Sequence, residues 1–141
     1  MSKAIKKFDP VDPEVEKLAT IVVDSALCVH RALGPGLLES VYEACLCHEL
    51  RKRGIEHLKQ AVLPIVYDGV TLEQGLRLDL LVGKKLIVEL KAVDDFLPIH
   101  DTQMLTYLKL SGLRLGLLLN FNVRLSSMAL KGSFGKGENA S

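Results

Sequence analysis

The chain has 141 residues, which suits a single domain that buries its own core. A hydrophobic content of 48% and a charged content of 25% indicate a globular protein, and the absence of any apolar run of about 20 residues argues against a membrane protein. The formal net charge of +1 argues against bulk positive charge as a means of binding nucleic acid, so such binding would depend on local clusters.

The first half of the chain predicts two helices. Residues 1–7 carry charge with no apolar stretch after them, so they do not resemble a signal peptide, and a cytoplasmic location is expected. Asp12 can cap a helix that starts at Pro13, and an apolar stripe at helical spacing then continues to Leu33. Gly34-Pro35-Gly36 ends this helix, and a second helix is predicted over residues 38–53.

Three strands are predicted next. Residues 59–67 form the first, and Pro64 inside it indicates an edge position or a bulge. Asp68-Gly69 is a hairpin turn signal, and a second strand runs from about Val70 through Asp79. The third strand follows a short turn and covers residues 86–91.

The remainder predicts a helix, a buried strand and a tail. The helix opens at Leu97-Pro98 and stops at Ser111-Gly112, and residues 113–121 form a near-continuous apolar strand, as in the centre of a sheet. We therefore expect a mixed α/β domain with one sheet over residues 1–125 and a flexible tail over residues 126–141.

Three charged residues interrupt the second and third strands, which are otherwise apolar. Glu89 and Lys91 point to the same face, and a three-residue turn at Gly83-Lys84-Lys85 would set Asp79 opposite Glu89. A two-residue turn would separate the carboxylates. Two carboxylates beside an ammonium suit metal-dependent phosphodiester cleavage, although the same residues also fit a surface hairpin with ordinary ion pairs.

Asp79 followed by Glu89-Leu90-Lys91 resembles the signature of the PD-(D/E)xK nucleases, except that Leu78 stands where the signature has proline. Upstream, the segment from Gly36 through Glu39 to Tyr42 resembles the motif of the GxxExxY family within that superfamily. Downstream, the segment from Gln103 to Tyr107 resembles the QxxxY motif of the RecB-type branch.

The resemblance implies a restriction-endonuclease-like α/β core, which is a mixed sheet flanked by helices. It also implies a nuclease that uses Mg²⁺ or Mn²⁺, with DNA the expected substrate. It implies catalytic roles for Asp79, Glu89, Lys91, Gln103 and Tyr107. The implied metal ligands are Glu39, Asp79, Glu89 and the Leu90 carbonyl. His48, Glu43 and Glu49 are weaker candidates on the second helix.

Each motif also has a plainer explanation. Glu39 suits the first turn of a helix through the helix dipole, and Gln103 and Tyr107 could belong to an ordinary amphipathic helix. A non-catalytic nuclease-fold module that binds nucleic acid or protein is therefore the alternative function, and a phosphohydrolase of small nucleotides is a third. The sequence leaves open the choice between DNA and RNA, endonuclease or exonuclease action, and whether the chain forms a homo-oligomer.

The basic clusters and the cysteines carry weaker functional signals. Residues 51–53 and Lys84-Lys85 are candidate phosphate contacts, although such clusters are commonly solvated surface. The three cysteines, Cys28, Cys45 and Cys47, have neither the number nor the spacing of a disulfide framework, a zinc site or an iron–sulfur site.

Overall fold

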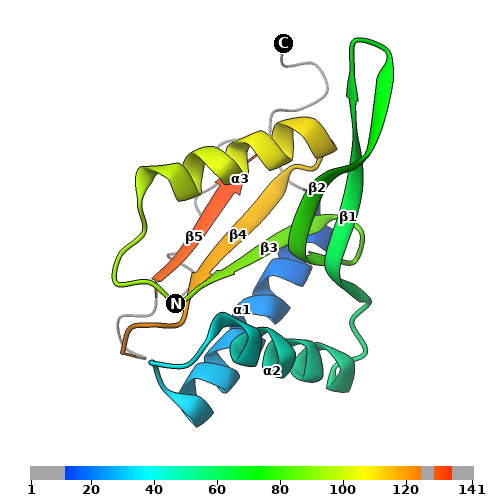
Figure 1. Ribbon diagram of the computed structural model, residues 1–141. Coiled ribbons are helices and arrows are strands. Elements are labelled where there is room, and N and C mark those ends of the chain that lie inside the picture. The colour runs from blue at the N-terminus through cyan, green and yellow to red at the C-terminus, as the bar shows by residue number, and fades with distance from the viewer. Residues whose placement is uncertain (1–11, 125–128, 135–141) are drawn as a thin grey trace.

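The computed structural model describes residues 12–124 and 129–134. Their strands form one five-stranded sheet in the order β1-β2-β3-β4-β5 (Figure 1). The strands are β1 (His57–Tyr67), β2 (Val70–Val82), β3 (Leu86–Lys91), β4 (Leu115–Asn120) and β5 (Ala129–Phe134). Across the described ranges, no helix has the length and apolar character needed to cross a bilayer.

Three helices flank the sheet, and they lie close to their predicted ranges. They are α1 (Pro13–Leu33), α2 (Glu39–Lys52) and α3 (Pro98–Ser111). Asp12 caps α1 by accepting a hydrogen bond from the Glu14 amide, as predicted. Gly112, in the left-handed conformation, ends α3.

The helices cover opposite faces of the sheet and create two cores (Figure 1). The first core lies under α1 and α2 and includes Leu80, Val88 and Leu117. The second lies under α3 and includes Leu78, Ile87 and Leu118. Alternate residues of β3 and β4 thus face different helices, which explains why both strands are apolar along their whole length.

The sheet is mixed, as the resemblance implies. β1, β2 and β3 are joined antiparallel, whereas β3 and β4 are parallel and are connected through α3. β1 lies at an edge, and its register with β2 shifts between Leu63 and Ile65, on either side of Pro64. The α/β fold and the predicted position of the proline are therefore confirmed.

The fifth strand differs from the prediction. Ala129–Phe134 falls inside the segment expected to be a flexible tail, yet it pairs antiparallel with the whole length of β4. All six residues of β4 are buried, and without β5 their outer backbone groups would form an unpaired sheet edge. Lys131, Gly132 and Ser133 interrupt the apolar residues of this segment, which concealed that pairing. The rest of the predicted tail, 126–128 and 135–141, lies outside the described residues.

A close contact fixes α3 against the sheet. Gly116 of β4 packs under Met104 of α3, and a Cβ atom at Gly116 would stand 2.3 Å from the Met104 sulfur. Only glycine allows the helix to approach this closely. This packing sets how far the α3 side chains lie from β3.

Candidate active site

The strands β2 and β3 separate at Asp79. Regular pairing joins Val82 to Leu86 and extends to Leu80 opposite Val88, so the turn has the three residues that the metal-site interpretation requires. Continuing that register by one step sets Asp79 opposite Glu89. The alternation of faces also breaks here, because Leu78 and Leu80, two residues apart, belong to different cores.

Where the regular pairing of β2 and β3 ends, the side chains of Asp79 and Glu89 each accept a hydrogen bond from a main-chain amide of the other strand. The Asp79 amide donates to Oε2 of Glu89 at 2.7 Å, and the Leu90 amide donates to Oδ2 of Asp79 at 2.9 Å. Each carboxylate thus takes the place of a backbone carbonyl as acceptor. The two carboxylates are held together at the point where the sheet opens.

Burial makes a negative charge on Glu89 costly. Glu89 is only 6% exposed, and its pKa is raised to about 8 by desolvation and by the charge of Asp79. The Asp79 amide and the charge of Lys91 act in the opposite direction and lower this pKa, but they do not offset the burial. A divalent cation beside the pair would favour the charged form of Glu89.

A third carboxylate comes from α2, and it is Glu43. This side chain is 9% exposed and accepts a hydrogen bond from Nε2 of Gln60 at 2.8 Å. Burial raises the pKa of Glu43, the Gln60 hydrogen bond lowers it, and the charge of Asp79 raises it again. Glu43 therefore lies within electrostatic reach of the central pair.

Glu39, the α2 residue favoured by the sequence, lies one helical turn before Glu43 and is exposed. Its charge also raises the pKa of Glu43, so the two glutamates are neighbours. The spacing of four residues was the signal that both could share one helix face. The sequence alone does not indicate which of the two glutamates is buried.

Tyr42 has a structural role in the described chain. Its hydroxyl donates to the Gly34 carbonyl at 2.7 Å and accepts from the Leu37 amide at 3.0 Å. Its ring stacks on Phe121, with ring centroids 4.5 Å apart. Tyr42 thereby holds the loop before α2 against the core. This contact fixes the start of α2, the helix that carries Glu39 and Glu43.

The α3 side chains face the carboxylate pair from the other direction. Nε2 of Gln103 donates to the Tyr107 hydroxyl at 2.8 Å, which joins the two residues on one face of the helix. Burial raises the pKa of Tyr107, and the negative charges of Glu89 and Asp79 raise it further. The structure therefore brings Tyr107 into the electrostatic field of the pair.

Lys91 ends β3 on the same face as Glu89 and is partly buried. It pairs in register with Asn120 of β4. Asn120 is buried, and its side chain donates to the Val93 carbonyl and accepts from the Val93 amide. These two hydrogen bonds, which the sequence did not predict, fix the chain just after Lys91.

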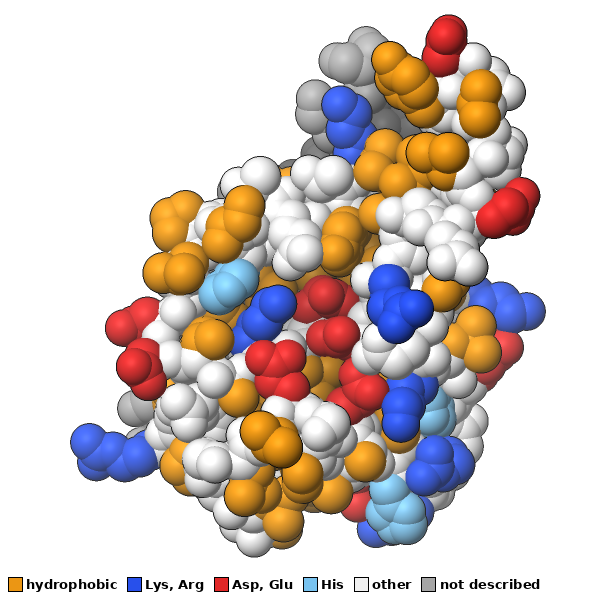
Figure 2. All heavy atoms as spheres, viewed as in Figure 1, with side chains coloured by type: hydrophobic (Ala, Val, Ile, Leu, Met, Phe, Trp, Pro, Cys, Tyr) orange, Lys and Arg blue, Asp and Glu red, His pale blue; other side chains and the backbone are white. Residues whose placement is uncertain are grey.

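Figure 2 shows acidic side chains gathered in a hollow between α2 and α3, with basic side chains around it. Within the described ranges, no group of three or more His, Cys, Asp or Glu side chains is arranged to hold a metal ion. Asp79 and Glu89 instead accept main-chain amides. The donors are nevertheless all oxygen atoms, the type that Mg²⁺ and Mn²⁺ prefer, so their chemistry fits such an ion.

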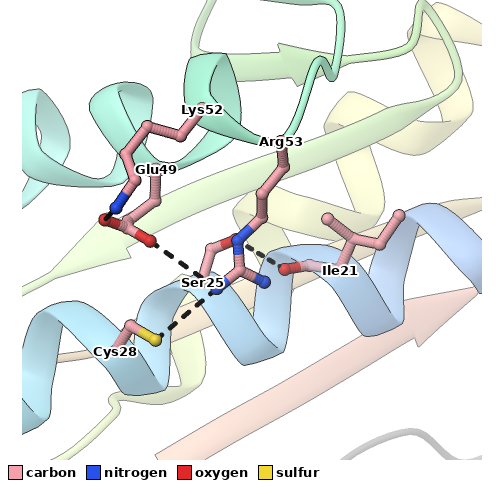
Figure 3. A network of polar contacts seen from close by, with 6 residues as sticks. All are labelled: Ile21, Ser25, Cys28, Glu49, Lys52 and Arg53. Carbon is pink, nitrogen blue, oxygen red and sulfur yellow. Dashed lines mark hydrogen bonds and ion pairs between the residues drawn. The ribbon is translucent and has the colours of Figure 1, made fainter.

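The basic clusters named from the sequence are largely engaged within the fold. Lys85 bridges Asp12 and Glu14 at the start of α1, and Lys84 lies 3.8 Å from Glu56. Lys52 and Arg53 pair with Glu49. Figure 3 shows Arg53 reaching from the end of α2 to Cys28 on α1, so this cluster ties the two helices together.

The comparison with protein families agrees with this geometry. A family model described as the PD-(D/E)XK nuclease superfamily matches residues 16–131, which is most of the chain. The chain therefore belongs to the PD-(D/E)XK nuclease superfamily. No curated protein and no solved structure matches it.

Proposed function

We propose that this protein is a metal-dependent nuclease that hydrolyses phosphodiester bonds in nucleic acid, with DNA as the expected substrate, and that it belongs to the GxxExxY family of the RecB-type branch. The observation that carries the proposal is the pair of Asp79 and the buried Glu89, with Lys91 beside it. A buried carboxylate with a pKa near 8 is a poor structural element by itself, and strongly shifted groups concentrate at functional sites.

The proposed ligands of Mg²⁺ or Mn²⁺ are the carboxylates of Asp79 and Glu89 and the Leu90 carbonyl, with Glu39 or Glu43 contributing from α2. When bound, such a cation supplies Lewis-acid stabilisation of the phosphate and lowers the pKa of a bound water. Each carboxylate accepts its main-chain amide through one oxygen, Oδ2 of Asp79 and Oε2 of Glu89, so its other oxygen could bind the cation.

The remaining residues would orient the reactants. The Lys91 ammonium would donate to the attacking water and stabilise charge that develops on the phosphate. The Gln103 amide and the Tyr107 hydroxyl, already joined by a hydrogen bond, would contact a phosphate oxygen or a water from the α3 side. This arrangement separates charge neutralisation on β2 and β3 from substrate orientation on α3.

The test is cleavage of single-stranded DNA, double-stranded DNA and RNA with Mg²⁺, with Mn²⁺ and with a chelator. Wild-type protein should cleave at least one substrate only when a divalent ion is present, and Asp79→Asn should abolish this activity. Asp68→Asn is the matched control, because it makes the same chemical change in the exposed turn between β1 and β2.

Two outcomes would count against the proposal. Equal cleavage by wild type and Asp79→Asn would assign the activity to a contaminating nuclease. Failure of the wild type to cut any substrate with either ion would favour the non-catalytic interaction module.

A further inference from the structure

Gln60 has a left-handed backbone, with φ of 53°, in the interior of β1. The other non-glycine residues with positive φ in the described chain, Asp68 and Lys84, lie in turns, where this conformation is common. Inside a strand it is unusual for a glutamine, and it persists only where the surrounding structure imposes it. Such an exception requires a physical reason.

The left-handed residue Gln60 lies beside the candidate active site. Lys59 pairs with Leu80 and Ala61 pairs with Leu78, so Gln60 is level with Asp79. At this level the strand pair changes faces, because Leu80 lies in the core under α1 and α2, whereas Ala61 and Leu78 lie in the core under α3. A left-handed residue at this level, between the paired Lys59 and Ala61, has the character of a β-bulge, which increases the local twist of a strand.

The side chain of Gln60 points from this place to α2. Its Nε2 donates to Oε2 of Glu43 at 2.8 Å, the one hydrogen bond to the Glu43 carboxylate among the described residues. The charge of Glu43 in turn raises the pKa of Glu89. A chain of contacts therefore runs from the unusual backbone, through Glu43, to the central pair.

We propose that Gln60 is a positioning residue whose left-handed backbone aims its amide at Glu43 and holds that carboxylate toward Asp79 and Glu89, where a divalent cation and its waters would bind. This inference rests on the proposed nuclease function. An amide suits the role because it orients a carboxylate without cancelling its charge, whereas a lysine or arginine would compete with the cation.

Gln60→Gly separates this role from a structural one. Glycine adopts the left-handed conformation without strain, so the variant removes the amide and relieves the backbone. We expect its melting temperature to equal or exceed that of the wild type, while the dissociation constant for Mn²⁺, measured by calorimetry, rises about 10–100-fold and cleavage falls in parallel. Asp68→Gly is the control, since it changes another left-handed residue to glycine away from the site and should leave Mn²⁺ affinity and cleavage unchanged.

A double-mutant cycle then identifies the partner. If Gln60 acts through Glu43, Gln60→Gly should have little further effect on Mn²⁺ affinity in a Glu43→Gln background. If Gln60→Gly does not fold, Gln60→Asn replaces it, because asparagine tolerates the left-handed conformation and its shorter side chain should not hold Glu43 in the same position.

The outcomes distinguish this inference from the proposed function. Wild-type Mn²⁺ affinity and cleavage in a folded Gln60 variant would overturn the positioning role alone, and so would full additivity with Glu43→Gln. A wild-type protein that neither binds Mn²⁺ nor cleaves nucleic acid would overturn both. The inference is supported if Gln60→Gly lowers the Mn²⁺ affinity without lowering the thermal stability, and if this loss of affinity does not occur in the Glu43→Gln background.

Discussion

Glu89 accepts the amide of Asp79, and Asp79 accepts the amide of the residue that follows Glu89. This reciprocal arrangement brings two carboxylates together, and burial and the charge of Asp79 oppose ionisation of Glu89 by raising its pKa. Charging Glu89 where the sheet opens is therefore costly unless a cation neutralises the charge. The consequences can be measured in stability as well as in activity.

The stability of the metal-free protein should fall as pH rises from about 4.5 to about 8. Glu89 has a folded-state pKa of about 8 against a reference value of 4.5, so the folded state binds more protons than the unfolded state in this range. Its contribution is fully present below the unfolded pKa and is lost as pH rises through the folded one, with a slope of up to about 1.4 kcal/mol per pH unit. Chemical denaturation at several pH values in a chelator measures this slope.

Glu89→Gln is the control for that experiment. It should flatten the pH dependence and raise the free energy of unfolding near pH 8, because an uncharged amide replaces a buried carboxylate. An unchanged slope in the variant would mean that other groups cause the pH dependence.

Lys91→Ala should separate metal binding from catalysis. Removal of a positive charge beside Glu89 should leave Mn²⁺ affinity near normal or make it tighter. Cleavage at saturating metal should nevertheless fall by roughly 10²–10³, the usual cost of losing one preorganised charge stabiliser. Rates measured against metal concentration test both statements, and equal maximal rates in the two proteins would remove Lys91 from the mechanism.

Gly116→Ala should displace α3 from the sheet. The added methyl group would overlap the sulfur of Met104, which is buried and has little space to move. Overpacking of this kind typically costs about 1–3 kcal/mol. Thermal unfolding measures the loss, and in a Met104→Ala background, which lacks the obstructing side chain, Gly116→Ala should cost less stability than in the wild type. An equal cost in the two backgrounds would show that the clash is not the cause.

Tyr42→Phe should destabilise the protein while leaving the ring stack intact. The change deprives the Gly34 carbonyl and the Leu37 amide of their hydroxyl partner and keeps the contact with Phe121. The expected loss is about 1–3 kcal/mol, measured by chemical denaturation. Tyr67→Phe is the matched control, because that tyrosine is exposed near the hairpin turn, and its stability should stay within about 0.5 kcal/mol of wild type. Equal stability of both variants would contradict the role assigned to Tyr42.

The sequence by itself determined the local features of this protein. The cap at Asp12, the turn at Asp68-Gly69 and the three-residue turn before Leu86 each depend on the conformational preferences of a few neighbouring residues. The length of the last turn alone sets Asp79 opposite Glu89, since strand side chains alternate with a period of two. Fold class and the central pair could therefore be predicted from pattern and turn length.

Only the tertiary structure decided which further residues join that pair. Glu39 and Glu43 share a helix face, and the docking of α2 against β1 buries the second against Gln60 and leaves the first exposed. The left-handed backbone of Gln60 and the pairing of β5 with β4 likewise have no strong local signal. Burial and pairing depend on neighbours that are distant along the chain, so residue type and spacing could not reveal them.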